Sequence, residues 1–211
     1  AECYDRMDLE LPAEQNEMIA RICRANPNTV VVLFAGAAVT MPWAKQVKSI
    51  LMAYLPGQAV GDALTDVLTG ACEPTGRLAE TFPARLEDTP SYGNFPGDGS
   101  VCDYAEGIYV GYRWYDKRKI NPQFAFGQGE GYTQFAYRDI SLSAGELDAD
   151  GAVQVNVTVQ NIGTRKGREV VQLYAAQESG QWGYVRQLKG FETLELEPGQ
   201  IGHVSFTLRA E

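Results

Sequence analysis

Residues 29–34 read T-V-V-V-L-F, an unbroken apolar and β-branched run that follows the helix-stopping N-P-N of residues 26–28. A strand that is apolar on both faces is typical of a parallel sheet covered on both sides. Residues 12–25 have apolar side chains at helical spacing, a leading proline, early glutamates and late arginines, which predicts an amphipathic helix. This helix-strand order places the first part of the chain in the α/β class.

The same alternation continues beyond the first strand. Residues 44–49 are expected to form a short helix and residues 50–54 a second apolar strand. The P-G of residues 56–57 then leads into a further helix, expected over residues 58–68. Residues 73–96 carry several prolines and glycines, and we expect them to form extended chain and loops over the surface.

The hydrophobic period changes to two in the last third of the chain. Valines at positions 153, 155, 157 and 159 alternate with polar residues, which predicts a strand with one buried face. Further strands are expected at residues 135–142, 169–176, 185–196 and 204–208, separated by turn sequences. We therefore predict a partial αβα sandwich with a mostly parallel sheet and linker loops over residues 1–130, followed by an all-β sandwich over residues 131–211.

Composition limits the classes of partner. The 211 residues include 18 Lys and Arg against 27 Asp and Glu, a formal net charge of -9 that repels phosphate backbones and anionic membranes. The chain is 45% hydrophobic with a mean hydropathy of -0.24, and it has no apolar run near the roughly 20 residues of a membrane-spanning helix. We expect a globular protein that binds neither nucleic acid nor membrane.

The cysteines and the single histidine show no pattern of a metal or redox site. Four cysteines lie far apart without a C-x-x-C pair, so free thiols and a cytoplasmic location are expected, with two disulfides and secretion as open alternatives. His203 lies in a predicted strand without a nucleophile nearby in the sequence. We predict no metal and no cofactor.

Short motifs along the whole chain resemble, in order, those of glycoside hydrolase family 3. The last two of them are similar to the fibronectin type III-like domain attached to many family members. The motifs are E-C-Y-D-R-M-D-L-E-L-P-A-E-Q, V-V-V-L-F-A-G-A-A-V-T-M-P-W, A-Y-L-P-G-Q-A-V-G-D-A-L-T-D-V-L-T-G, P-T-G-R-L-A-E-T-F-P, Y-A-E-G-I-Y-V-G-Y-R-W-Y-D, F-A-F-G-Q-G-E-G-Y-T-Q-F, V-T-V-Q-N-I-G-T-R-K-G-R-E-V-V-Q-L-Y and L-K-G-F-E-T-L-E-L-E-P-G.

The resemblance implies a retaining β-glycosidase, most closely a β-glucosidase, that acts on terminal β-linked sugars. Its members use an Asp nucleophile on a (β/α)8 barrel and a Glu acid/base from the α/β domain, and a retaining mechanism needs these two carboxyl groups roughly 5 to 5.5 Å apart. A barrel takes about 250 residues, more than this whole chain. We therefore expect a fragment that lacks the barrel and the first half of the α/β domain and is inactive alone. Its uncovered half-sheet would need the missing segment or a second copy in a homodimer.

Carried over by position, the resemblance makes Glu2 the acid/base candidate. Tyr4 would stack on a sugar face, and Asp5 and Arg6 would hold the loop by an ion pair, since an arginine fork suits a carboxylate. The aromatic residues around Glu106 have two interpretations, a leaving-group subsite or sheet packing at strand spacing over Tyr109–Tyr112 and its neighbours. Trp43 is expected to be structural.

A second function class fits the same fold. An α/β remnant and a sandwich could serve as a non-catalytic module for carbohydrate binding or oligomerisation, because both architectures host many activities. A barrel with an Asp nucleophile elsewhere in the same reading frame would discriminate the enzyme from the module.

Overall fold

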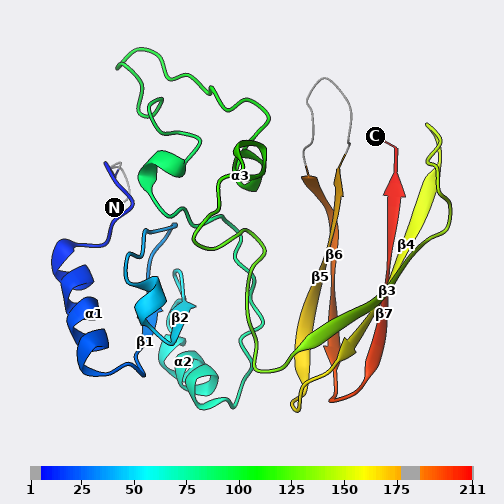
Figure 1. Cartoon of the computed structure of the whole chain (residues 1–211), viewed down its shortest axis with the longest axis horizontal. Coiled ribbons are helices and arrows are strands. Elements are labelled where there is room, and N and C mark those ends of the chain that lie inside the picture. The colour runs from blue at the N-terminus through cyan, green and yellow to red at the C-terminus, as the bar shows by residue number, and fades with distance from the viewer. Residues whose placement is uncertain (1–5, 177–185, 211) are drawn as a thin grey trace. The chain divides into compact units, whose positions relative to one another are not determined.

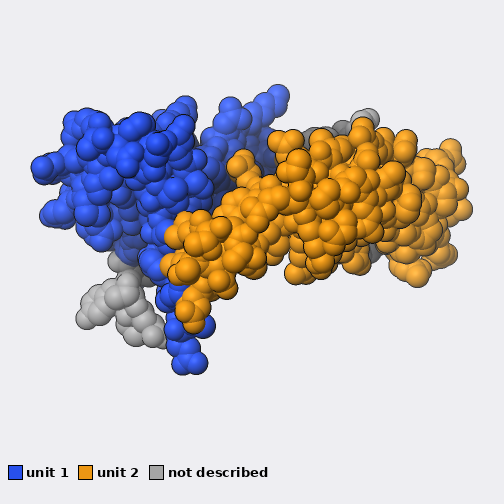
Figure 2. Space-filling model, turned by 90° about the horizontal axis from the view of Figure 1, so that it is seen from below, with its two compact units in different colours: residues 1–61, 78–126 blue, residues 62–77, 127–211 orange. Residues whose placement is uncertain are grey.

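The chain divides into two compact units in the computed structural model, which describes residues 6–176 and 186–210. Unit 1 comprises residues 1–61 and 78–126, and unit 2 comprises residues 62–77 and 127–211 (Figure 2). This division differs from the single boundary expected after residue 130. The reason is that side chains and backbone at residues 70–77 form hydrogen bonds and an ion pair within unit 2.

The predicted first helix is present as α1, Ala13–Ala25 (Figure 1). Pro12 occupies the N-cap position, where its missing N–H costs nothing. Ile19 and Cys23 lie four residues apart, so they share one face and are both buried. The helix ends at Asn26, whose backbone is extended.

A small parallel sheet forms the centre of unit 1. Strands β1 (Val30–Leu33) and β2 (Ser49–Met52) pair in register, with Val31 opposite Ile50. The core of unit 1 combines α1, β1, the loop after β1 and a later residue, Phe82. Its buried residues are Ile19, Cys23, Val31, Leu33, Ala38, Val39, Met41, Trp43 and Phe82.

Two expectations for unit 1 were wrong. The helix expected over residues 44–49 is a single 3-10 turn, η1 (Ala44–Gln46), because Val47 already has an extended backbone. The segment 73–96 was expected to lie over the surface, but Phe82 is 1% exposed and its N–H donates to the carbonyl of Phe124 at 2.9 Å.

The other helical elements of the described residues are α2 (Val60–Thr69), η2 (Leu86–Asp88) and α3 (Tyr112–Arg118).

Unit 2 contains the predicted antiparallel sandwich. One sheet has the order β3-β4-β7 and the other pairs β5 with β6 (Figure 1). The strands are β3 (Phe135–Leu142), β4 (Ala152–Asn161), β5 (Gly167–Ala176), β6 (Arg186–Leu196) and β7 (Ile201–Arg209).

The alternating valines of β4 form the centre of the sandwich core. Val155 and Val159 are 1% and 0% exposed, whereas the polar residues between the valines point away from the core. Val171 of β5 and Phe206 of β7 pack in the same cluster. Within residues 6–176 and 186–210, no helix is both long and apolar enough to cross a membrane.

Candidate functional site

The candidate acid/base segment begins before the part of the chain that the structure describes. Glu2, Tyr4 and Asp5 lie outside the described residues, so their predicted roles stay predictions. Arg6 is the first described residue, and its guanidinium donates to the backbone carbonyl of Glu10. Arg6 also lies 3.7 Å from the carboxylate of Asp8. Sequence reasoning proposed only Asp5 as its ion-pair partner and missed Asp8, although that residue lies two positions away.

The segment is fixed to unit 1 at Leu9. The backbone N–H of Thr40 donates to the carbonyl of Leu9 at 2.8 Å, and the Thr40 hydroxyl lies 3.4 Å from the same oxygen. Thr40 belongs to the loop that follows the carboxyl end of β1. In open α/β sheets ligands bind at the carboxyl ends of the strands. The candidate acid/base segment is thus attached to the connection between β1 and β2.

Side chains from distant segments support this loop. Gln123 accepts the N–H of Met41 at 3.1 Å with its amide oxygen and donates to the carbonyl of Met41 at 2.7 Å. The N–H of Ala38 donates to a carboxylate oxygen of Glu80 at 3.1 Å. Trp43 is 1% exposed and its indole N–H donates to the side-chain oxygen of Asn16 at 2.8 Å, which confirms its expected structural role.

A hollow of about 420 Å3 opens in unit 1 beside this loop. Its walls combine Leu9 of the N-terminal segment with apolar and aromatic side chains and the carboxylate of Glu80. The stacked rings of Tyr112 and Phe126, 5.0 Å apart, belong to its lining. A concave, mostly apolar surface with a carboxylate is the usual form of a small-molecule site. Its further lining residues include Ala38, Thr81, Pro83, Pro90 and Tyr115.

Two buried or partly buried phenols of unit 1, one of which lines the hollow, stay protonated at neutral pH. Burial, and then the charge of Asp88, raises the pKa of Tyr115 to about 12. Burial, and then the charge of Glu80, raises the pKa of Tyr54 to about 12. Neither tyrosine therefore forms a phenolate near pH 7.

The aromatic residues around Glu106 lie in different environments. Tyr112 and Tyr115 line the hollow, whereas Tyr104 is 81% exposed. The strand spacing inferred for Tyr109–Tyr112 was wrong, because Tyr112 is the first residue of the helix α3. Gly111 before it has φ +59°, a backbone conformation that glycine tolerates and that ends any strand there.

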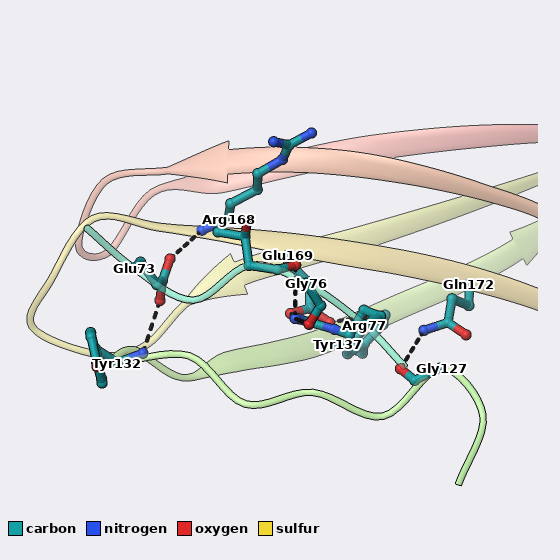
Figure 3. A network of polar contacts seen from close by, with 10 residues as sticks. Glu73, Gly76, Arg77, Gly127, Tyr132, Tyr137, Arg168, Glu169 and Gln172 are labelled. Carbon is teal, nitrogen blue, oxygen red and sulfur yellow. Dashed lines mark hydrogen bonds and ion pairs between the residues drawn. The ribbon is translucent and has the colours of Figure 1, made fainter. Parts of the chain in front are cut away.

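A second polar arrangement lies in unit 2 and was not anticipated from the sequence (Figure 3). The carboxylate of Glu73 accepts the backbone N–H of Tyr132 at 3.0 Å and that of Arg168 at 2.8 Å. A Cβ atom at Gly131 or Gly167 would lie 2.4 or 2.8 Å from this carboxylate, so a side chain at either position would displace the Glu73 carboxylate. The only sequence signal was the abundance of glycine around these positions, which did not show what the glycines accommodate.

The same arrangement includes a shielded ion pair. Arg77 lies 2.9 Å from Glu169, and their side chains are 13% and 16% exposed. The hydroxyl of Tyr137 donates to the other oxygen of Glu169 at 2.9 Å (Figure 3). Burial, and then the charge of Glu169, raises the pKa of Tyr137 above its usual range, so the hydroxyl remains a donor. These contacts make residues 73–77 an integral part of the sandwich unit.

Replacing Glu73 by alanine is expected to destabilise unit 2 by about 2 kcal/mol. Two backbone N–H groups lose a charged acceptor, and hydrogen bonds to charged groups contribute about 1.5–3 kcal/mol each before solvent exposure reduces them. Urea denaturation followed by circular dichroism measures the loss. Glu192→Ala, at an exposed position on β6, is the matched control and should change stability by less than about 0.5 kcal/mol. Equal effects of the two substitutions would contradict this role of Glu73.

The described residues include no cluster of three or more His, Cys, Asp or Glu side chains that could hold a metal ion. Cys23, Cys72 and Cys102 are free thiols, and Cys3 lies outside the described residues. His203 lies on β7, as predicted, and its ring contacts the hydroxyl of Thr158 at 3.2 Å.

Comparison with known proteins identifies the chain. The model of the glycosyl hydrolase family 3 C-terminal domain matches residues 1–112, and that of the fibronectin type III-like domain matches residues 169–211. The chain belongs to glycosyl hydrolase family 3. The first match includes Glu2 and the N-terminal segment that is attached at Leu9 to the connection between β1 and β2.

Relatives of this family 3 chain are longer than it is. It is 46% identical to thermostable β-glucosidase B of Acetivibrio thermocellus over 209 residues, which cover 99% of this chain and 28% of the relative. It is 44% identical to a β-glucosidase of Rhizobium radiobacter over 206 residues, which are 95% of this chain and 25% of that protein. The chain thus spans about a quarter of the length of these curated relatives.

Solved structures share the fold of the family 3 chain. The crystal structure of a family 3 β-glucosidase from Bifidobacterium adolescentis matches with a TM-score of 0.93 and 37% identity, over 100% of this chain and 31% of that one. DesR, a β-glucosidase from Streptomyces venezuelae in complex with D-glucose, matches with a TM-score of 0.90 and 36% identity, over 98% of this chain and 27% of that one. The α/β class followed by a fibronectin type III-like sandwich is therefore confirmed.

Proposed function

We propose that this chain supplies the acid/base side of the active site in a retaining β-glucosidase that hydrolyses terminal β-linked sugars. The observation that carries the proposal is the match of the family's C-terminal domain over residues 1–112, which includes the E-C-Y-D-R segment with Glu2. Two relatives that match 99% and 95% of the chain are named β-glucosidases.

Glu2 acts in two steps of the proposed mechanism. It first protonates the glycosidic oxygen as that oxygen leaves the anomeric carbon, while the nucleophile on the barrel forms a covalent glycosyl-enzyme. It then removes a proton from the water that attacks the same carbon, and the sugar leaves with its β-configuration retained. Tyr4 contacts the sugar, and Asp5 with Arg6 positions the loop.

Described contacts support the positioning part of this proposal. Arg6 and Asp8 form an ion pair next to the candidate residues, and the carbonyl of Leu9 accepts two donors from Thr40. These contacts fix residues 6–9, the part of the segment that follows the candidate residues, and efficient acid/base catalysis requires a positioned group.

The chain of 211 residues alone is expected to have no activity, because it offers no barrel nucleophile. When the chain is joined to the barrel and to the preceding part of the α/β domain, we expect it to hydrolyse nitrophenyl β-glucoside. The first product should be β-glucose, which proton NMR detects before mutarotation. Turnover by the 211-residue chain would contradict the proposal that the acid/base lies on this chain and the nucleophile on the barrel. A folded full-length protein that binds sugar and hydrolyses no glycoside would support the binding-module alternative instead.

A further inference from the structure

The loop that follows β1 is buried although it has no regular secondary structure. Residues 34–43 form neither helix nor strand, and Val39, Met41 and Trp43 are 0%, 2% and 1% exposed. Buried backbone N–H and C=O groups need hydrogen-bond partners, and this loop cannot obtain them all from a helix or a sheet. The side chains that supply such partners therefore fix the course of the loop.

Gln123 supplies both partners of one loop residue. Its amide oxygen accepts the N–H of Met41 at 3.1 Å, and its amide nitrogen donates to the carbonyl of Met41 at 2.7 Å. A glutamine amide has an acceptor and two donors, so one side chain can pair with both backbone groups of a residue, as a residue of a neighbouring antiparallel strand does. The contact joins residues that are 82 positions apart in the sequence.

The backbone of Gln123 is itself fixed to the core. Its N–H donates to the carbonyl of Phe82 at 2.8 Å, and the next residue, Phe124, forms an isolated β-bridge with Phe82. Phe82 is 1% exposed and belongs to the core of unit 1. Gln123 therefore attaches the Met41 backbone to a part of the unit that has little freedom to move.

Thr40 extends this restraint to the candidate acid/base segment. Thr40 is joined to Met41 by a peptide bond, and its N–H donates to the carbonyl of Leu9 at 2.8 Å. The hydroxyl of Thr40 lies 3.4 Å from the same oxygen. Next to Leu9, the N–H of Glu10 donates to the carboxylate of Asp8 at 3.0 Å, so residues 8–10 form a local turn. A displacement of Met41 would thus displace the donor that holds this turn.

We propose that Gln123 is a positioning residue for the acid/base: it holds Met41, and through Thr40 it fixes the segment that follows the E-C-Y-D-R motif. Gln123 has this role only if Glu2 of that motif is the acid/base, so the inference rests on the proposed function. Proton transfer in the transition state requires a group held in place, and a displacement of about 1 Å can lower the rate about a hundredfold. Gln123 contacts neither the substrate nor the reacting atoms and acts through the loop alone.

The test compares two substrates in the full-length protein. Gln123→Met keeps an unbranched side chain of similar length and removes both hydrogen bonds to Met41. We expect kcat/KM for cellobiose to fall at least about tenfold, because its sugar leaving group needs a correctly placed proton donor. For nitrophenyl β-glucoside we expect a fall of less than about threefold, since nitrophenolate leaves without a proton. Partial unfolding would lower both values by the same factor, so their ratio reports the placement of the acid and not stability.

Two further variants complete the test. Gln123→Glu keeps an acceptor for the Met41 N–H and removes the donor to the Met41 carbonyl, so its ratio should lie between those of the wild type and Gln123→Met. This milder variant decides the question if Gln123→Met does not fold. Gln172→Met is the matched control, because the Gln172 amide also makes two hydrogen bonds, to the Gly127 carbonyl at 2.9 Å and from the Tyr174 hydroxyl at 2.8 Å. Its ratio should equal that of the wild type.

Comparison with Glu2→Ala separates the failure of this inference from the failure of the proposed function. If Glu2→Ala loses activity selectively on cellobiose and the Gln123 variants keep the wild-type ratio, Gln123 is not a positioning residue, although the proposed function stands. Equal losses on both substrates in the Gln123 variants, or a ratio changed as much in Gln172→Met, would also overturn the inference. If Glu2→Ala shows no selective loss, the proposed function itself fails, and the role of Gln123 fails with it.

Discussion

Replacing Glu2 by alanine in the full-length protein is expected to lower kcat/KM for cellobiose by roughly a thousandfold. Positioned general acid/base catalysis contributes typically about a hundredfold to ten-thousandfold. The leaving group of cellobiose is a sugar alcohol, which departs poorly unless its oxygen is protonated. The loss should be much smaller for nitrophenyl β-glucoside, because nitrophenolate leaves without a proton. Steady-state kinetics on both substrates measure this difference.

Glu10→Ala is the matched control for Glu2→Ala. Glu10 is an exposed glutamate in the same segment, and its contact with Arg6 uses the backbone carbonyl, which the substitution retains. We expect wild-type activity on both substrates. An equal loss on cellobiose and on the nitrophenyl glucoside in the Glu2 variant would indicate disturbed folding or binding and not a missing acid.

Replacing Trp43 by alanine is expected to destabilise unit 1 by about 4 kcal/mol. Removing a buried tryptophan costs about 3–5 kcal/mol through lost burial and the cavity left behind. Trp43 is 1% exposed, and its indole N–H donates a hydrogen bond to the side-chain oxygen of Asn16 in α1. The variant therefore also leaves the Asn16 oxygen without this donor. Domains are stable by only about 5–15 kcal/mol, so much of the stability is lost. Urea denaturation followed by far-UV circular dichroism provides the measurement.

Two further substitutions separate the causes in the Trp43 variant. Trp43→Phe keeps most of the apolar volume and removes the hydrogen bond, and we expect it to cost about half as much as alanine. Tyr104→Ala removes an aromatic ring that is 81% exposed and should change stability by less than about 0.5 kcal/mol. A Trp43→Ala effect as small as that of Tyr104→Ala would contradict the core assignment.

The sequence predicted the elements whose periodicity is local. The period-two pattern of the valines at residues 153–159 located β4, and the helical spacing located α1, because in each case one face of a regular element is buried against the core. Residues 44–49 were misread because a short segment offers too little periodicity to distinguish a helix from a single 3-10 turn. Motif order predicted the family, which the comparisons confirm.

Long-range contacts were not predictable from the same patterns. Phe82 lies in a proline-rich and glycine-rich segment that looks like surface loop, yet it pairs with Phe124 and is buried, which only tertiary packing decides. Glu73 meets Tyr132 and Arg168 across 59 and 95 residues of sequence. The candidate site was predictable only through the resemblance of its motif, because Glu2 has no periodic or spaced partner in this chain.

The assignment of Glu2 as the acid/base is tested most directly by azide rescue of the Glu2→Ala variant in the full-length protein. Removing the carboxylate opens room for a small anion and removes the charge that would repel it, so azide can attack the glycosyl-enzyme without base catalysis. The account predicts that added azide restores turnover of nitrophenyl β-glucoside and that β-glucosyl azide accumulates, as detected by NMR. If the variant hydrolyses cellobiose like the wild type, or if azide yields no glucosyl azide from an impaired variant, Glu2 is not the acid/base.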